Sequence, residues 1–530
     1  MKKPPSFARV SAAQPFGITG NIVRVEVDIV PGTLNSFNII GVPDKAVEES
    51  RDRVGTALRN CGFPSPKHAN QKTVVSLLPA ELRKEGSYYD VAIAIGCLLA
   101  GHSIQATVEK SVFLGELSLN GDIQPIRGVL PLVLEARNQG FNVAYVPAHN
   151  ANESSIVDGI TVFGVEHLRD LVSHLDQERY AAMMAEEKMS PEVNALTPIE
   201  YTPHISVTHK IYPNINTIKG QEMAKRACEI AAAGCHSIAL YGPPGTGKTM
   251  LARAFTGLLP NLSIDESIEV TGIHSVAGTL EQSLVTQPPF RSPHHTSSYV
   301  ALVGGGSIPK PGEVTLSHRG VLFLDEFPEF DTRVLESLRQ PLEDKRVTVS
   351  RARGTVEFPA NFILVAAMNP CPCGFAGSKV KKCSCTEMQL RKYRKKLSGP
   401  LVDRIDLWVP VEHISYEDLH SMETSGESSD TIRDRVQYAR TRSHERAVSV
   451  GLGYPNNLLS AKDMNNIGLS EAGQKILMMS AEKLHLSPRA YHRVMRVART
   501  IADLDSSTTI EDRHILDALS YRPRSPLVDA

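Results

Sequence analysis

Hydrophobic periodicity in the first 175 residues predicts an α/β domain. Apolar residues alternate with polar ones over 21–30, which is typical of a half-buried strand. Residues 44–61 have the spacing of an amphipathic helix, 73–79 form a second strand-like run, and 90–99 form an apolar helical run. Strands and helices that alternate in this way form layered α/β domains.

Three short apolar runs in the middle of the chain predict a second sheet. They cover residues 238–241, 321–324 and 362–368. Runs that are apolar at every position are typical of parallel strands buried on both faces. The stretch before them has a charged start, a Met-rich helix and then proline-spaced polar residues, and it indicates a linker. The pattern after them is helical. The expected organisation is an N-terminal domain at 1–175, a linker at 176–211, a central domain at 212–411 and a C-terminal helical domain at 412–530.

Length and composition narrow the class of protein. A chain of 530 residues is long enough for roughly three domains. Its net charge of −1 shows no general basic excess, so any binding of nucleic acid must come from local patches or a ring-shaped channel. No apolar run reaches membrane-spanning length, and the first residues lack the apolar core of a signal peptide. With eight cysteines, four of them clustered, these features predict a cytoplasmic protein.

A phosphate-binding loop follows the run at 238–241. Its eight residues match the spacing G-x-x-x-x-G-K-[ST] and are Gly242, Pro243, Pro244, Gly245, Thr246, Gly247, Lys248 and Thr249. Glycines let backbone N–H groups curl around phosphate oxygens, and the following helix adds its positive N-terminal end. Lys248 can reach the β- and γ-phosphates, and the Thr249 hydroxyl can bind Mg²⁺. The loop therefore predicts binding of ATP or GTP.

The other two central strands end in polar residues that suit hydrolysis. Asp325 and Glu326 follow one strand, and Asn369 follows the next. Ligands bind at the carboxyl ends of parallel strands, so we expect Asp325 to hold Mg²⁺ and Glu326 to activate water. Asn369 can position the same water, or it can be a turn residue before Pro370. An Asp-Glu pair by itself could be a solvated strand end, but its place after the phosphate loop favours catalysis.

Arginines near the end of the central domain and in the C-terminal domain suit a shared site. Arg404 lies in the segment 398–406, and an arginine at a subunit edge can stabilise charge on a neighbour's γ-phosphate. Such an arrangement requires a closed ring. Arg489 shares a helical face with Arg493 and Arg496, and that face is either a working surface or a solvated basic face.

Two segments of the central domain carry basic residues suited to nucleic acid. Residues 272–319 form a long insert rich in Gly, Ser and His that includes Lys310. Residues 346–358 alternate about a tight turn and predict a β-hairpin with Arg351 and Arg353 near its tip. Several copies facing one channel would supply phosphate contacts independent of sequence. The alternative is a structural hairpin with solubilising arginines.

Four clustered cysteines predict a metal site. They are Cys371, Cys373, Cys383 and Cys385. Two close pairs of thiolates can bind Zn²⁺ tetrahedrally, and the alternatives are reduced thiols or a regulatory disulfide. Lys381 and Lys382 lie between the pairs and favour phosphate backbone. For His294 and His295, a pore-loop or packing role is favoured over metal binding.

Together these motifs resemble an AAA+ ATPase of the magnesium-chelatase/MCM type, and nearly the whole chain resembles the bacterial ComM/YifB family of magnesium-chelatase-like proteins. The resemblance implies that Asn369 is sensor 1, Arg404 an arginine finger acting on the adjacent subunit, and Arg489 sensor 2, in its own or a neighbour's site. It also implies a hexamer that uses ATP and Mg²⁺, with the insert projecting into the central pore. The hairpin would grip DNA, and the C-terminal helices would form a lid.

The N-terminal region resembles the proteolytic domain of Lon without its catalytic dyad. Residues 84–90 match the segment around the nucleophile, and 114–128 match the segment leading to the dyad lysine. Tyr88 falls at the serine position and Leu130 at the lysine position, and Ser87 is one residue away. A Ser–Lys dyad needs an aligned nucleophile and a desolvated amine, so we expect this inactive domain to serve DNA contact or ring assembly.

The leading hypothesis is an ATP-driven, ring-forming DNA motor. The family resemblance implies a branch-migration helicase that acts in homologous recombination during natural transformation. The alternative is a magnesium-chelatase-type motor that remodels a protein partner. An ATP-dependent protease is disfavoured by the missing dyad, and a non-hydrolysing scaffold is disfavoured by the intact phosphate loop.

Overall fold

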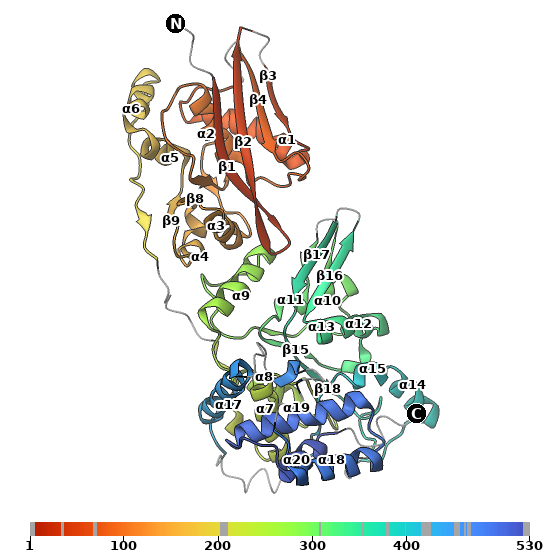
Figure 1. Cartoon of the computed structure of the whole chain (residues 1–530). Coiled ribbons are helices and arrows are strands. Elements are labelled where there is room, and N and C mark those ends of the chain that lie inside the picture. Colours follow the sequence, from red (N-terminus) through yellow and green to blue (C-terminus); the bar gives the residue numbers. More distant parts are fainter. Residues whose placement is uncertain are drawn as a thin grey trace. The chain divides into compact units, whose positions relative to one another are not determined.

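The computed structural model forms two compact units (Figure 1). The first comprises Met1–Val207 with Ser267–Val285, and the second comprises Thr208–Glu266 with Thr286–Ala530. The structure describes residues 6–32, 36–66, 71–201, 210–306, 309–351, 354–377, 381–397, 399–414, 426–449, 456–459, 463 and 468–522. The chain therefore enters the first unit twice, the second time for a short segment only.

An eight-stranded sheet forms the framework of the first unit, in the order β10-β9-β8-β5-β1-β2-β4-β3. The bounds are β1 (Phe7–Phe16), β2 (Thr19–Pro31), β3 (Ser36–Ile40), β4 (Gln71–Leu78), β5 (Ser111–Phe113), β8 (Val143–Pro147), β9 (Thr161–Val165) and β10 (Pro198–Ile199). A separate two-stranded sheet pairs β6 (Glu116–Leu117) with β7 (Ile123–Gln124). Strand β2 pairs antiparallel with β1 along the whole length of β1, which confirms the strand predicted over 21–30.

Helices cover this sheet with apolar side chains. They are α1 (Lys45–Asn60), α2 (Asp90–Ala100), α3 (Val129–Asn138), η1 (Ala148–Asn150), α4 (Ala151–Ser154), α5 (Leu168–Leu175) and α6 (Gln177–Glu186). Asp44 begins α1 by accepting a hydrogen bond from the Val47 N–H at 2.8 Å. Helix α2 is buried at nearly every position because it packs against β1, β2 and α1, which explains its continuous apolar run.

The predicted linker at 176–211 differs from the structure in its first half. Helix α6 buries Tyr180 and Met184 in the core of the first unit, and β10 pairs with β9. Two buried side chains on a ten-residue helix are a weak sequence signal, and only tertiary packing turns the segment into part of the domain. Residues 202–209 of that linker lie outside the described residues.

The predicted insert at 272–319 is also divided. Helix α9 (Ile264–Ala277) belongs to the first unit from Ser267 onward. There the N–H of Gly128 donates to the carbonyl oxygen of Ser275 at 3.2 Å. The part of the insert up to Val285 therefore packs with the N-terminal fold, and the rest belongs to the second unit.

A five-stranded parallel sheet carries the second unit. Its order is β12-β15-β18-β11-β19, with bounds β12 (Phe290–Arg291), β15 (Val321–Leu324), β18 (Ile363–Met368), β11 (Ile238–Tyr241) and β19 (Leu407–Pro410). All three strands predicted for the central domain are confirmed. They are buried along nearly their whole length, and their carboxyl ends lie at one edge because every pair is parallel.

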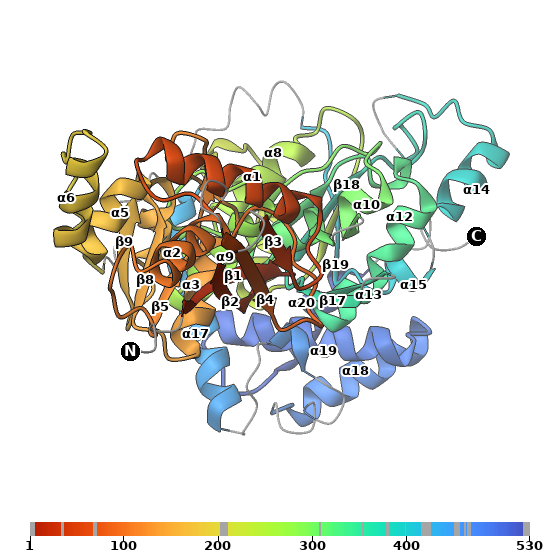
Figure 2. The same cartoon turned by 90° about the horizontal axis from the view of Figure 1, so that it is seen from above.

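Helices complete the second unit around one apolar core. The longer ones are α7 (Glu222–Gly234), α8 (Lys248–Thr256), α17 (Ser429–Ser449), α18 (Glu471–Lys483), α19 (Pro488–Leu504) and α20 (Asp512–Ser520). The last three lie side by side (Figures 1 and 2). Shorter elements are η2 (Ile215–Thr217), α10 (Tyr299–Val303), β13 (Gly304–Gly305), β14 (Lys310–Pro311), α11 (Glu313–Leu316), η3 (Phe327–Glu329), α12 (Thr332–Ser337), α13 (Arg339–Asp344), α14 (Glu387–Lys395), α15 (Gly399–Val402) and η4 (Asn456–Leu458). One buried cluster joins the sheet to the C-terminal helices.

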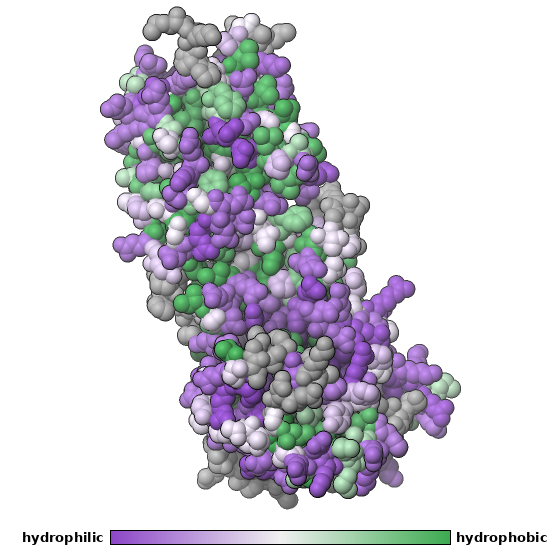
Figure 3. All heavy atoms as spheres, viewed as in Figure 1, coloured by the Kyte–Doolittle hydropathy of each residue, from purple (hydrophilic) through white to green (hydrophobic). Residues whose placement is uncertain are grey.

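The predicted hairpin is present as β16 (Arg346–Arg351) and β17 (Gly354–Pro359). The strands pair antiparallel from Arg346↔Pro359 to Arg351↔Gly354. Residues 352 and 353 lie outside the described residues. Hydrophilic side chains predominate around α14 (Figure 3), whose last turn carries Lys392, Arg394 and Lys395.

Candidate nucleotide-binding site

The phosphate loop connects β11 to α8 with the backbone conformation that its glycines predict. Gly245 and Gly247 have φ angles of 78° and 88°, in the left-handed region that favours glycine. At Gly242 a Cβ atom would lie 2.0 Å from the Val411 carbonyl oxygen, so only glycine fits there. Helix α8 begins at Lys248, so the N-terminal end of this helix faces the loop.

Lys248 lies inside this loop and is largely buried. Its Nζ donates to the carbonyl oxygens of Gly242 at 2.8 Å and Pro243 at 2.7 Å, and lies 3.3 Å from Asn369 Oδ1. Burial lowers the pKa of Lys248, and the nearby carboxylate of Asp325 opposes that shift. A phosphate bound in the loop would therefore contact the Lys248 ammonium group at a position that is largely shielded from water.

Asp325, which follows β15, contacts Thr249, which follows Lys248. The Thr249 hydroxyl donates to Asp325 Oδ2 at 2.9 Å, so the two predicted Mg²⁺ ligands are neighbours. Glu326 adopts a left-handed backbone with φ of 50°, and its own N–H donates to Asp325 Oδ1 at 2.9 Å. Because of this turn, the carboxylate of Asp325 contacts Thr249, whereas the carboxylate of Glu326 contacts a different residue.

Glu326 has a partner that the sequence did not assign to catalysis. His295 Nδ1 lies 3.2 Å from Glu326 Oε2. His295 follows β12, which pairs in parallel with β15, so both residues lie just beyond the ends of neighbouring strands. The His295 ring also lies against the ring of His294, with 4.2 Å between centroids and an angle of 34° between the ring planes. The preceding strand β12 consists only of Phe290 and Arg291, and two residues are too few for a strand to be recognised from periodicity.

Asn369 stands at the end of β18 between two contacts. Its side-chain oxygen faces Lys248, and its carbonyl oxygen accepts from the Tyr393 hydroxyl at 3.0 Å. Tyr393 is a buried residue of α14, and burial raises its pKa above the usual range. The structure thus brings Asn369 to the phosphate loop, as its expected role requires.

The two predicted arginines meet at a different place. Arg404 Nη2 lies 2.6 Å from Glu343 Oε1, and Arg489 Nη2 lies 3.9 Å from the same oxygen. The Arg404 side chain is 9% exposed and that of Arg489 is 64% exposed. Glu343, near the end of α13, was not identified from the sequence. The structure therefore groups the predicted residues into a phosphate-loop set and an arginine set.

A buried carboxylate anchors the segment that carries Arg404. Asp406 accepts from Arg493 at 2.9 Å and from the Ser237 N–H at 3.1 Å, and His236 Nδ1 lies 3.6 Å away. Burial opposes ionisation of Asp406, but the charge of Arg493 and the neighbouring His236 hold its pKa below the usual range. Arg496 donates to the Leu459 carbonyl oxygen. Arg493 and Arg496 thus make structural contacts, and the predicted basic working face is reduced to Arg489.

The four clustered cysteines converge after β18. Their sulfur atoms all lie within 4.8 Å of one another. The separations are 3.3 Å for Cys371–Cys373, 3.5 Å for Cys373–Cys383 and 3.7 Å for Cys371–Cys383. Sulfurs bound tetrahedrally to Zn²⁺ at about 2.3 Å stand about 3.8 Å apart, so the donor set fits this ion. Backbone N–H groups of Phe375 and Ser384 lower the pKa of Cys373 to about 5, whereas burial raises the pKa of Cys385 to about 12, so the fit to a metal rests on the sulfur geometry.

The remaining candidate residues for DNA lie on separate elements. Lys310 is an exposed residue of β14, and Arg351 ends β16. The side chain of Arg351 and all of Arg353 lie outside the described residues. Lys381 Nζ lies 4.9 Å from the centre of the Phe375 ring, and Lys382 is exposed. These groups stay predictions for nucleic-acid contact.

In the first unit, the residues aligned with the Lon dyad have other partners. Tyr88 is half-buried, and this burial raises its pKa to about 12. Leu130 is fully buried in an apolar cluster. The Ser87 hydroxyl donates to the carboxylate of Glu116.

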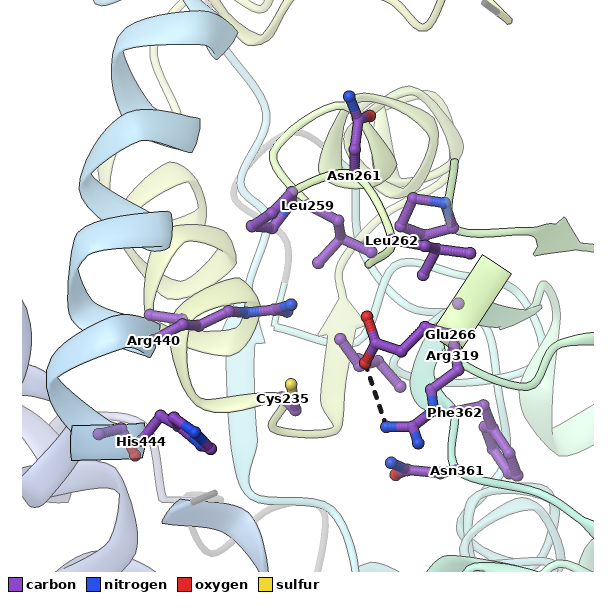
Figure 4. Close-up of a pocket in the computed structure, with 16 residues that line it drawn as sticks. Cys235, Leu259, Asn261, Leu262, Glu266, Arg319, Asn361, Phe362, Arg440 and His444 are labelled. Atoms are coloured by element: carbon purple, nitrogen blue, oxygen red, sulfur yellow. Dashed lines mark ion pairs between the residues drawn. The ribbon is translucent and has the colours of Figure 1, made fainter. Parts of the chain in front are cut away.

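A cavity of about 340 Å³ lies at the opposite edge of the second sheet, where β15 and β18 begin (Figure 4). An ion pair of 3.2 Å joins Glu266 to Arg319 in its wall. Arg440 and His444 reach it from α17. Because the phosphate loop lies where the strands end, this cavity is distinct from the phosphate-binding set.

The residues at the carboxyl edge fit a nucleoside triphosphate with Mg²⁺. A glycine loop at a helix N-terminus provides amides for phosphates, and Lys248 adds a cation. The hydroxyl of Thr249 and carboxylate of Asp325 are hard oxygen ligands suited to Mg²⁺. The fold and site thus define a P-loop module with a sheet order of 2-3-4-1-5 along the chain.

Comparison with known proteins identifies the family. The model described as "Magnesium chelatase, subunit ChlI" matches residues 214–419. "Subunit ChlI of Mg-chelatase" matches 25–150, and "Magnesium chelatase, subunit ChlI C-terminal" matches 426–522. The chain is 39% identical to "Competence protein ComM" of Haemophilus influenzae, over 98% of this chain and 97% of that protein. It is 37% identical to an uncharacterized protein, YifB, of Escherichia coli, with the same coverage.

The chain belongs to the ComM/YifB family of magnesium-chelatase-like AAA+ proteins, whose members are typically ATPases. A further match covers 31% of the chain at 27% identity, to Lon protease 2 of Bacillus subtilis. This similarity agrees with the Lon-like pattern expected for part of the chain. None of the described helices is long and apolar enough to cross a membrane.

Proposed function

We propose that this protein is an ATP-hydrolysing, ring-forming motor that acts on DNA. The observation that carries the proposal is the convergence of the phosphate loop, Asp325 and Asn369 at one sheet edge, with Thr249 and Asp325 in contact. The relative named as a competence protein supports a role in the handling of DNA during competence. Branch migration in homologous recombination is the proposed activity within that role.

The chain's own residues divide the chemistry of hydrolysis. Backbone N–H groups and Lys248 bind the phosphates, and Thr249 and Asp325 hold Mg²⁺, which neutralises charge on the phosphate oxygens. Glu326 accepts a proton from the attacking water, and Asn369 orients that water. His295, 3.2 Å from Glu326, acts as a positioning residue that sets where the carboxylate points.

Arg404 and Arg489 act on a neighbouring subunit in this proposal. Both contact Glu343, whereas Lys248 contacts Asn369. Arginines that leave a shared carboxylate for a neighbour's γ-phosphate would complete the site only in a closed ring, for which a hexamer is proposed. Because Arg404 and Arg489 both contact Glu343, we expect them to lie on the same face of the subunit. Arg489 would then also act on the site of the neighbouring subunit.

DNA is proposed to contact the β16–β17 hairpin and Lys310. The hairpin is a regular two-stranded element with arginine at its last described pair. In a ring, copies of this element would supply phosphate contacts despite the net charge of −1. The four-cysteine cluster is proposed to hold Zn²⁺, since its sulfur separations fit that ion.

The second candidate is a motor that remodels a protein partner, which the magnesium-chelatase family models favour. Measuring ATP turnover with no DNA, single-stranded DNA and a labelled branched junction separates the two. A DNA motor should show faster turnover with DNA and should move the junction, and Arg351→Ala with Arg353→Ala should weaken both effects. Arg346→Ala, at the other end of the same hairpin, is the matched control. If DNA changes neither turnover nor junction, the DNA proposal is wrong.

A further inference from the structure

We propose that the metal-bound cysteine cluster is a structural support of the nucleotide pocket, so that ATP binding depends on Zn²⁺ at Cys371, Cys373, Cys383 and Cys385. The inference rests on the proposed binding of ATP. It adds that a metal on one side of the phosphate loop fixes the conformation of that loop. The metal takes no part in the chemistry and lies outside the set of residues that would touch the nucleotide.

The first observation is that the cysteine loop lies directly against the phosphate loop. A Cβ atom built on Gly374 would lie 2.7 Å from Cδ of Pro244 and 3.9 Å from Cγ of Asn369. Gly374 has a φ of 85°, and its N–H donates to the Cys371 carbonyl oxygen at 2.9 Å. A tight turn between the first two cysteines and the rest of the cluster therefore forms one wall of the phosphate loop.

The second observation is that both ends of the cysteine segment are tied to Asn369. Cys371 follows Asn369 by two residues and is fully buried. Helix α14 follows Cys385, and its Tyr393 donates to the Asn369 carbonyl oxygen at 3.0 Å. Asn369 in turn faces Lys248. A movement of the cysteine segment would therefore shift the side-chain amide of Asn369, which contacts Lys248.

The third observation concerns what holds this segment in place. Three of the four cysteines are partly exposed, and the segment supplies few buried apolar side chains of its own. A loop with so little core needs another source of order, and a Zn²⁺ ion that closes it provides one. Coordination releases the thiol protons to solvent and joins Cys371 and Cys373 to the distant pair Cys383 and Cys385. Without the ion, the wall against Pro244 loses its fixed position.

One experiment measures zinc content and ATP affinity on the full chain. Cys383→Ser with Cys385→Ser removes the two ligands that are farther from Asn369 in sequence, and Cys235→Ser, outside the cluster, is the control. Zinc per chain is measured by mass spectrometry of the metal, and Kd by titration with a fluorescent ATP analogue. Fluorescence of Trp408, the chain's single tryptophan, reports whether the second unit stays folded. The expected result is about one zinc in wild type and control, and a loss of roughly tenfold or more in affinity for the zinc-free variant.

A second pair of variants tests the contact itself while the cysteines stay intact. Gly374→Ala places a methyl group against Pro244, whereas Gly377→Ala places one in open space at a similar φ of 74°. Both should carry zinc and share the same backbone strain, and only Gly374→Ala should lose affinity for ATP.

The outcomes separate the inference from the proposed function. Equal Kd values for zinc-free and zinc-loaded protein, equal values for the two glycine variants, or a wild type without zinc would each overturn the inference. A zinc-loaded wild type that binds no ATP would overturn the proposed function itself.

Discussion

Asp406 provides a test of how the arginine-bearing segment is held. In Asp406→Asn the amide keeps the size of the side chain but removes the negative charge that faces Arg493 and His236. The side chains of Asp406 and Arg493 are 11% and 14% exposed. The variant therefore leaves a largely buried guanidinium without its counter-charge, which costs about 3 kcal/mol of unfolding free energy.

Urea unfolding followed by Trp408 fluorescence measures this cost. Trp408 is buried in β19, two residues after Asp406, so its signal reports the second unit. With an m-value of about 3 kcal/mol per molar urea, a loss of about 3 kcal/mol lowers the midpoint by about 1 M. Asp430→Asn, which removes an exposed partner of Arg433, is the matched control and should cost under about 1 kcal/mol.

The effect should depend on pH with a definite sign. Because the pKa of Asp406 is lowered in the folded protein, its contribution is complete above the unfolded pKa of about 4 and is lost as pH falls toward the folded pKa. The difference between wild type and Asp406→Asn should thus be constant near neutral pH and should shrink below about pH 4. Equal midpoints for the Asp406 and Asp430 variants near neutral pH would refute the anchoring role.

Three further predictions concern the catalytic set. Glu326→Gln should bind ATP with a Kd close to wild type but lose turnover, and steady hydrolysis in this variant would remove Glu326 from its assigned role. Arg404→Ala and Lys248→Ala should each be inactive, and mixing the two variants should restore part of the turnover. The Arg404 variant then supplies an intact phosphate loop, and the Lys248 variant supplies the arginine. Mixtures without any recovery would contradict action in trans. His295→Ala should lower kcat about tenfold with little change in KM, since it positions the base and not the nucleotide, and His295→Gln should recover part of kcat; a changed KM with unchanged kcat would argue against positioning.

Local sequence predicted the elements whose signal is contained in a few adjacent residues. The strand β15 was visible because all four of its residues are apolar, and β16–β17 was visible because its alternation reverses about a tight turn. Strand β12 could not be predicted, because two residues are too few to show a periodic pattern of apolar positions. It nevertheless places His295 beside Glu326. Helix α6 lies in the segment predicted as a linker, and its contribution to the core is limited to two buried side chains.

Local sequence is sufficient to predict the phosphate loop, the acids after β15, the amide after β18 and the cysteine spacing. These depend on fixed local spacing and on the rule that parallel strands end at one edge, so Thr249 and Asp325 could be expected to meet across 76 positions. The family followed from the same residues.

Which side chains share a partner depends on tertiary packing. It brought Arg404 and Arg489 to Glu343, placed the turn at Gly374 against Pro244, and put residues 267–285 with the first unit. The physical reason is that these contacts join segments far apart in the chain, whose approach depends on packing of the whole core and leaves no local period in the sequence.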